Sequence, residues 1–177
     1  MPFGDKATES AAEAYRGVLS EEVLNAAYEM LDKCIDNNFG GLTQLASFAN
    51  QAAWSLQAND RPASLVFSWS VCEAVISEKW EHYLRRERRN PGFEPPNRER
   101  RNRLTRQNVS TVTEFLNLAD VIDNNTLDRL EAARNTRNRW IHQRRNPSRG
   151  SCHESIDLAC VLISEYLGPS VLVAVGD

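Results

Sequence analysis

Three residues in one short segment have side chains that could act on a phosphodiester. Arg137, Asn138 and His142 lie within six consecutive positions. A neutral imidazole can remove the proton of a ribose 2′-hydroxyl, and a guanidinium can stabilise the charge that develops on the phosphoryl group. The amide of Asn138 could hold a phosphate oxygen or orient the imidazole. These residues predict metal-independent cleavage of RNA, with His142 as acid and base and Arg137 as phosphate ligand.

The same residues also have a purely structural interpretation. A histidine in the last turn of a helix is stabilised by the helix dipole, and neighbouring arginines can form a solvated face. The other two histidines, His82 and His153, are expected at the surface and at the end of a helix. Only His142 lies among several arginines, so it is the candidate for catalysis.

A long helix is expected to carry the three residues. Residues 123–126 are typical of a turn that caps a helix, and the apolar pattern from Leu127 predicts a helix to about Arg145. On that helix Arg137 and His142 are about 140° apart, so they flank a seam. Arginine is unfavourable on a core face unless it meets a partner or a cleft. The face of Arg137 also holds Leu127, Leu130, Arg134 and Ile141.

The segment from Arg137 to His142 resembles the Arg-x(4–6)-His motif of the HEPN superfamily (higher eukaryotes and prokaryotes nucleotide-binding domain). It reads Arg-Asn-x-x-x-His, and residues 133–136 resemble the approach to that motif in many members. Residues 68–76 resemble the long early helix of the family. Gln143 departs from the family pattern, because a small residue, often glycine, commonly follows the histidine.

The resemblance implies an α-helical bundle that forms a homodimer, in which two copies of the motif meet in one composite ribonuclease site. It implies catalytic roles for Arg137 and His142, with Asn138 positioning. Many members are metal-independent endoribonucleases that act as toxins or in antiviral defence, whereas others are inactive and bind RNA or proteins. Glu73 is then a candidate partner of an active-site arginine, or one half of a buried structural ion pair.

Positive charge is concentrated in two blocks of an otherwise acidic chain. The net charge is −3, yet residues 129–149 hold seven basic and one acidic residue and residues 79–106 hold ten and four, so each block carries +6. Eighteen of the 21 basic residues are arginine, whose planar fork suits phosphate contacts. RNA is therefore the expected partner. Four further arginines of the first block are expected to contact it: Arg134, Arg139, Arg144 and Arg145.

The second block has two interpretations. Residues 85–106 could form a rim that follows RNA phosphates around the catalytic cleft, with Phe93 available to stack on a base. They could also be a highly charged loop without a ligand.

Helical periodicity predicts an all-α protein, namely an antiparallel helical bundle of HEPN type with extra N-terminal helices. Apolar residues recur at helical spacing in five segments: after Ser20, over 42–56, over 65–83, over 109–119 and over 156–167. Segments 90–96 and 146–151 contain proline and glycine and are expected to be loops. We expect a tail at 1–18, a single helical domain at 19–167 and a tail at 168–177.

Composition excludes several other classes of protein. Apolar residues make up 41% of the 177 residues, and no apolar run approaches the roughly 20 residues that cross a bilayer. The first residues lack the pattern of a secretory signal, so a cytoplasmic protein without a membrane partner is expected. Cys152 and His153 are neighbours, but no second pair at metal-ligand spacing accompanies them. No metal or other cofactor is expected.

A catalytically inactive module is the competing functional prediction. The protein would then be an adaptor or antitoxin-like partner that holds nucleic acid or an acidic protein on its basic blocks. It would bind in a salt-sensitive way, cleave nothing and respond little to His142→Ala. A bundle that binds only proteins is a third alternative. For a ribonuclease toxin, an antitoxin or other regulatory protein is an expected partner.

Overall fold

The structure, a computed structural model, describes Asp32, residues 41–86 and residues 97–167. Contacts divide the chain into two compact units, Met1–Asn38 and Phe39–Asp177, and the helices below belong to the second. The predicted loop at 90–96 and tail at 168–177 lie outside the described residues, as does the predicted helix after Ser20 except for the helical Asp32. The predicted domain limits at residues 18 and 167 stay predictions.

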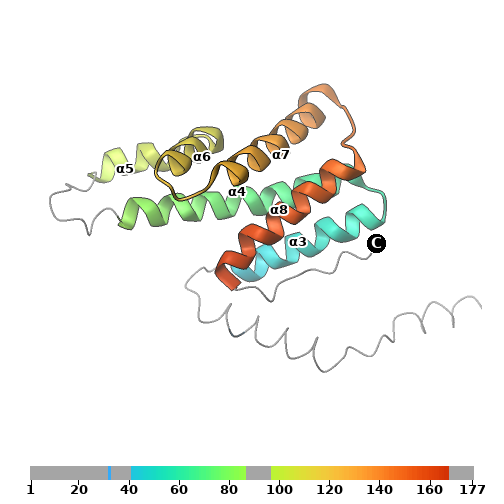
Figure 1. The fold of residues 1–177 in the computed structure, drawn as a ribbon, viewed down its shortest axis with the longest axis horizontal. Helices are drawn as coiled ribbons and strands as arrows, with labels where there is room; N and C mark the ends of the chain where they lie inside the picture. Colours follow the sequence, from blue (N-terminus) through green and yellow to red (C-terminus); the bar gives the residue numbers. More distant parts are fainter. Residues whose placement is uncertain (1–31, 33–40, 87–96, 168–177) are drawn as a thin grey trace, which may run out of the picture. The chain divides into compact units, whose positions relative to one another are not determined.

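The described part of the second unit consists of six α-helices without a strand, which confirms the predicted all-α fold (Figure 1). Short links of three and five residues join α3 to α4 and α7 to α8, so each pair is a helical hairpin. None of these described helices combines the length and the apolar character needed to span a membrane. The helices are α3 (Leu42–Gln57), α4 (Arg61–Arg86), α5 (Arg98–Thr105), α6 (Val109–Leu118), α7 (Asn124–Gln143) and α8 (Arg149–Leu167).

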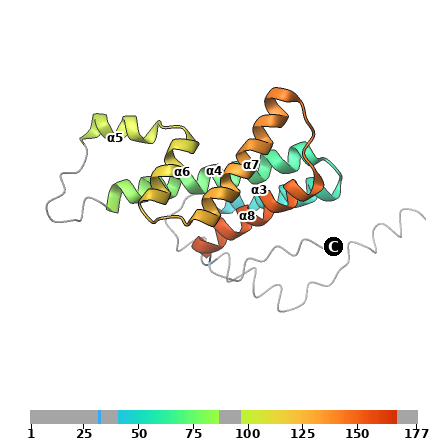
Figure 2. The same ribbon diagram turned by 45° about the horizontal axis from the view of Figure 1, so that its top comes forward.

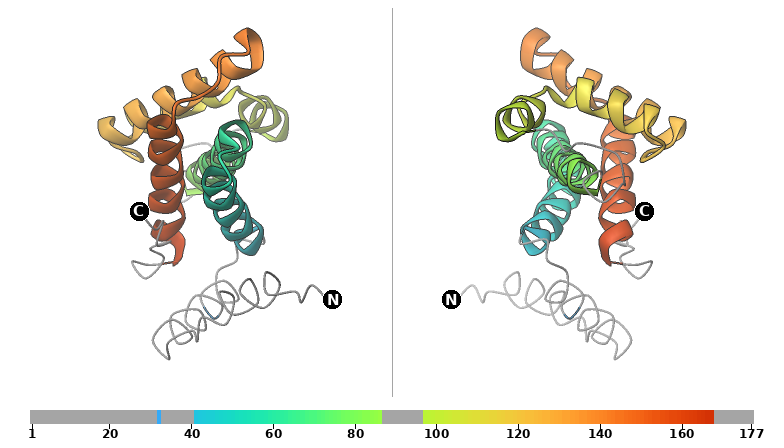
Figure 3. Two further views of the ribbon diagram at one scale, coloured as in Figure 1. Left: turned by 90° about the vertical axis from the view of Figure 1, so that its right-hand side faces the viewer. Right: turned by 90° about the vertical axis from the view of Figure 1, so that its left-hand side faces the viewer.

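Helix α4 is the central element, because it contacts each of the other five described helices. Its 26 residues give it a length of about 39 Å. Helix α7 crosses one side of α4 and α8, whereas α3 lies on the opposite side of α4 (Figures 2 and 3). Helical spacing predicts an apolar stripe that also includes Val66, but Val66 is 40% exposed, and Val71, outside the stripe, is fully buried. The fully buried residues of the predicted stripe are Leu65, Cys72, Val75 and Ile76.

Helix α8 begins earlier than the sequence predicts. Residues 146–151 form the expected loop only as far as Ser148, and the helix starts at Arg149. The Ser148 hydroxyl accepts a hydrogen bond from the Ser151 N–H at 3.0 Å, and the Ser148 carbonyl accepts one from the Cys152 N–H at 3.2 Å. Ser148 is therefore the N-cap, and the loop prediction is wrong for the three residues after it.

Helix α8 packs against α4 through small polar residues. The hydroxyls of Ser68 on α4 and Ser155 on α8 are buried and hydrogen bonded at 2.8 Å, and Ser68 also donates to the Ser64 carbonyl at 2.9 Å. Small side chains allow close approach of the two helices, and the hydroxyls of Ser68 and Ser155 are partners of each other. Because α7 contacts both α4 and α8, the packing of these two helices against each other determines the surface on which α7 lies.

Helix α7 begins with a capping carboxylate, as the sequence predicts. The Asp123 side chain accepts a hydrogen bond from the Thr126 N–H at 2.7 Å. Hydrogen bonds from the Thr126 side chain and backbone lower the pKa of Asp123 from its ordinary 3.8. The helix starts at Asn124, three residues before Leu127, because the cap satisfies its free N–H groups.

Replacing Asp123 by alanine should lower the unfolding temperature at neutral pH. The unfolding temperature of the variant should also change less than that of the wild-type protein as the pH is lowered. The folded pKa is below the unfolded one, so the carboxylate stabilises the fold above the unfolded pKa and loses this effect as pH falls through the folded pKa. Thermal unfolding followed by circular dichroism at neutral and acidic pH measures this. Asp123→Asn, which keeps a capping oxygen without the charge, should retain more stability than alanine. Equal stability of the wild-type protein and the alanine variant at neutral pH would contradict the capping role.

Candidate functional site

Arg137 extends the buried face of α7. Leu130 and Ala133 are the buried residues of this helix, and Arg137 lies seven positions after Leu130, about two helical turns further on the same side. Its side chain is half-buried. The structure thus bears out the predicted interruption of an apolar stripe by arginine, and a cation is held where the pattern would place a hydrophobic residue.

Arg137 contacts Asn138, its neighbour in sequence. A guanidinium Nη1 of Arg137 donates to the Asn138 side-chain oxygen Oδ1 at 3.2 Å. Within the described residues, no carboxylate forms an ion pair with Arg137. A half-buried guanidinium with a neutral partner keeps most of its positive charge uncompensated, so the site favours an anion. Of the two roles predicted for Asn138, orientation of the imidazole is not seen, because its oxygen faces Arg137.

His142 is exposed and lies in the last turn of α7. No hydrogen bond orients its imidazole among the residues that the structure describes. The helix ends one residue later at Gln143. The next residue, Arg144, has left-handed backbone torsions with φ of 53° and donates its N–H to the Trp140 carbonyl at 2.9 Å. The imidazole is therefore accessible to a ligand, and the last backbone carbonyls of the helix are partly satisfied.

The left-handed backbone of Arg144 explains why position 143 can hold glutamine instead of a small residue. Gln143 is still helical, so it needs no glycine-like torsion, and the chain reverses one position later. A left-handed arginine is less favourable than glycine by roughly 1–2 kcal/mol. Arg144 occupies that position, and its charged side chain is exposed beside the end of the helix.

Of the four arginines predicted to contact RNA, three lie at or just after the C-terminal end of α7, whereas Arg134 lies in the middle of the helix. Arg134 is half-buried, and its Nη2 lies 3.7 Å from Oε1 of Glu131, one helical turn earlier. The other three arginines are exposed and, within the described residues, form no ion pair: Arg139, Arg144 and Arg145. Residues 132–153 contain six arginines and no acidic residue. The end of α7 is therefore positively charged, which offsets the negative end of its helix dipole for an anionic ligand.

Glu73 does not join this site by an ion pair. It is half-buried on α4, and none of the ion pairs between described residues includes it. Neither of its predicted pairings, with an active-site arginine or within a buried structural pair, is seen.

The second basic block lies elsewhere in the unit. Its described helical part, α5, lies beside the C-terminal end of α4, whereas the C-terminal end of α7 lies at the opposite end (Figures 1 and 2). Within one chain, α5 therefore does not lie beside His142, because the chain folds back along α7 after α6. The predicted rim around a dimer cleft stays a prediction. Phe93 lies outside the described residues.

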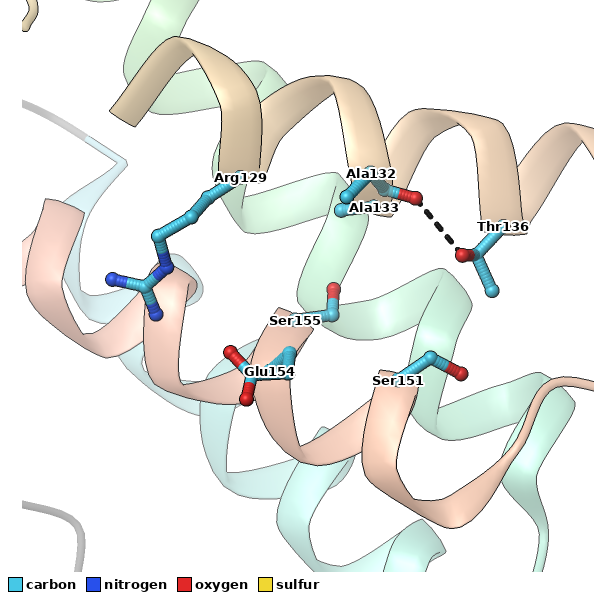
Figure 4. A pocket seen from close by; sticks show the side chains of 7 residues that line it. All are labelled: Arg129, Ala132, Ala133, Thr136, Ser151, Glu154 and Ser155. Atoms are coloured by element: carbon cyan, nitrogen blue, oxygen red, sulfur yellow. Dashed lines mark hydrogen bonds between the residues drawn. The ribbon is translucent and has the colours of Figure 1, made fainter. Parts of the chain in front are cut away.

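A cavity of about 310 Å³ lies between α7 and α8 (Figure 4). Arg129 forms one part of its wall, and its Nη2 forms an ion pair with Oδ2 of Asp157 at 2.5 Å. Neither Arg137 nor His142 is among the residues that line the cavity. Sequence reasoning did not identify it, because small residues of two helices create it without a spacing signal. The lining residues are Arg129, Ala132, Ala133, Thr136, Ser151, Glu154 and Ser155.

The three cysteines that the structure describes are poor nucleophiles in this fold. Burial raises the pKa of Cys72 to about 12, and burial also raises the pKa of Cys152 and of Cys160. These three thiols therefore remain protonated at neutral pH. In the described ranges, no three His, Cys, Asp or Glu side chains gather in a way that could hold a metal ion.

Comparisons with protein-family models, with curated proteins and with solved structures find no match to this chain.

Proposed function

We propose that the protein is a metal-independent endoribonuclease of HEPN type, which cuts RNA with Arg137 and His142. One observation carries the proposal. Arg137 is half-buried, contacts Asn138 and has no carboxylate partner among the described residues, and the exposed His142 lies five residues further along the same helix. A phosphate would supply the missing negative charge. The resemblance in sequence extends the proposal to a toxin or antiviral defence effector in the cytoplasm, controlled by an antitoxin or another regulatory protein.

The proposed reaction is transesterification within the RNA chain. The imidazole of His142 takes the proton of a 2′-hydroxyl, the 2′-oxygen attacks phosphorus, and the bond from phosphorus to the 5′-oxygen breaks. The leaving 5′-oxygen takes up a proton, and the products are a 2′,3′-cyclic phosphate and a 5′-hydroxyl. Arg137 stabilises the phosphoryl oxygens as their charge increases. Asn138 keeps its amide N–H₂ free for a phosphate oxygen, because its Oδ1 accepts from Arg137.

We further propose that the site is completed by a second copy of the chain. Arg137 and His142 are about 140° apart on α7, so one chain presents them on either side of a seam. Ile141 lies between them and is 44% exposed, which leaves an apolar side chain next to the charged groups. A dimer across this face would cover Ile141 and bring a second Arg137 and His142 to the phosphate.

An inactive RNA-binding module is the second candidate, and one observation favours it. The imidazole of His142 has no hydrogen bond from a described residue that would fix its tautomer, whereas catalytic histidines are commonly oriented by one. The second copy or the RNA would have to supply that bond in an active site.

Chemical blocking of the 2′-oxygen tests the reaction class. The wild-type protein in EDTA should cut a single-stranded RNA and leave unchanged the same sequence with 2′-O-methyl groups, because the nucleophile is absent. Denaturing electrophoresis measures the cleavage, and mass spectrometry should find cyclic phosphate ends. Equal cleavage of both oligonucleotides would contradict the proposed chemistry, and binding of the RNA without cleavage would favour the inactive module.

A further inference from the structure

We propose that α5 and the exposed ring of Phe115 form a second, separate binding surface for single-stranded RNA. The surface consists of the arginines of residues 98–106 together with Phe115. It goes beyond the proposed function, because it does not require Arg137 or His142 to be catalytic.

The charge of α5 is uncompensated within the fold. Residues 97–107 hold five arginines and one acidic residue, Glu99. Helix α5 contains no buried residue, and none of its arginines forms an ion pair with another described residue. Like charges one turn apart destabilise a helix, so this sequence is unfavourable for an unliganded helix. An anion on this surface would relieve the repulsion.

Specific contacts nevertheless keep α5 in place. Eight residues are too few for a stable isolated helix. The Asn97 side chain caps its first turn by accepting from the Arg100 N–H at 2.8 Å. At the other end, the indole N–H of the buried Trp80 on α4 donates to the Leu104 carbonyl at 2.9 Å. The fold therefore holds a helix that contributes little to the core.

Three of the five arginines lie on the side of α5 that faces away from this attachment, whereas Arg100 and Arg101 flank Leu104. At 100° per residue, Arg98, Arg103 and Arg106 fall within an arc of about 140°, and Leu104 lies on the opposite side. Arg98, Arg103 and Arg106 are exposed, whereas Leu104 is half-buried. Guanidinium groups arranged in this way can follow a line of phosphates.

An exposed aromatic ring stacks on Trp80, the residue that holds the charged helix. The ring of Phe115 on α6 stacks on Trp80, with centroids 5.9 Å apart and planes 15° apart, and Tyr83 stacks on Trp80 at 5.8 Å. Phe115 is 43% exposed although Trp80 beneath it is buried. Arginines beside an exposed aromatic ring are the combination that binds single-stranded nucleic acid through phosphates and base stacking. An acidic protein segment would use the charges but would gain less from the ring.

A direct binding measurement tests the proposal. The probe is a fluorescein-labelled oligouridine of about 12 nucleotides. The parent protein is the full chain with His142→Ala, so that the probe remains intact, and fluorescence anisotropy is recorded over a range of salt concentrations. Each lost phosphate contact should reduce the slope of log affinity against log salt by about 0.7. For Arg98→Gln/Arg103→Gln/Arg106→Gln we expect a slope shallower by about 2 and roughly 100-fold weaker binding at about 0.1 M salt.

Four further variants separate the effect of charge from the effect of stacking. The corresponding triple lysine variant keeps the charge and should retain most of the affinity. Glu99→Gln removes the one acidic side chain of α5 and should strengthen binding. Phe115→Ala should weaken binding about fivefold or more through lost stacking, whereas Leu118→Ala, at a residue that is 79% exposed on the same helix, should have little effect.

Unchanged binding by the triple glutamine variant, with the helical spectrum retained, would overturn the proposal. Polyglutamate that binds in the same α5-dependent way, while oligouridine does not bind, would also overturn it in favour of an acidic protein partner. The two proposals fail separately: RNA cleavage that needs His142 without α5-dependent binding leaves the proposed function intact, and α5-dependent binding without cleavage leaves only this inference.

Discussion

Replacing His142 by alanine should lower the rate of RNA cleavage by about 100- to 10,000-fold, the usual contribution of a general acid or base. The imidazole is exposed at the end of α7, so its removal should leave the fold and the unfolding temperature almost unchanged. Single-turnover cleavage of a labelled RNA in EDTA measures the rate, and circular dichroism checks the fold.

His82→Ala is the matched control for this variant. His82 is also an exposed histidine on a long helix, but it lies on α4. The His82→Ala variant should cleave RNA at the wild-type rate. Undiminished cleavage by His142→Ala would rule out the proposed role, and an equal loss in both histidine variants would indicate a general effect of charge or stability instead.

Replacing Leu65 by alanine should lower the free energy of unfolding by about 3 kcal/mol, within the range for a buried leucine. Leu65 is 0% exposed and belongs to a cluster that joins α4 to α3 and α8. Its removal leaves a cavity among Ala52, Leu56 and Ile156. A typical domain is stable by about 5–15 kcal/mol, so this change is a large fraction of the total.

Val66→Ala is the control for that measurement, because Val66 is the next residue of α4 and is 40% exposed. Val66→Ala should lower the free energy of unfolding by less than about 1 kcal/mol. Equilibrium denaturation in urea gives both values. A smaller loss for Leu65→Ala than for Val66→Ala would contradict the packing of α3, α4 and α8 described above.

Helical spacing predicted most of the fold because each long helix buries one face. The helix from Leu65 to Trp80 follows the predicted 3.6-residue period, and the structure places it at the centre of the unit, which periodicity does not determine. The cap at Asp123 was also readable, since a carboxylate precedes a helical pattern there. The start of α8 was not, because Ser148 acts as a cap only when the preceding loop leaves its hydroxyl near the N–H of Ser151.

The candidate site could be predicted in part. The arginine on the buried face of α7 follows from spacing alone, and the structure places Arg137 there. The contact between Arg137 and Asn138 could not be predicted, because adjacent residues on a helix point in different directions and only side-chain torsions bring them together. The distance of α5 from the end of α7 depends on the length and path of α6 and α7, which periodicity does not determine.

Cleavage of one RNA by purified wild-type protein and by the Arg137→Ala/His142→Ala double variant, side by side in EDTA, tests the central claim most directly. We expect 2′,3′-cyclic phosphate ends from the wild-type protein and none above background from the double variant, with both proteins folded. Cleavage at equal rates by the two proteins would contradict the claim, as would binding of the RNA by both proteins with cleavage by neither.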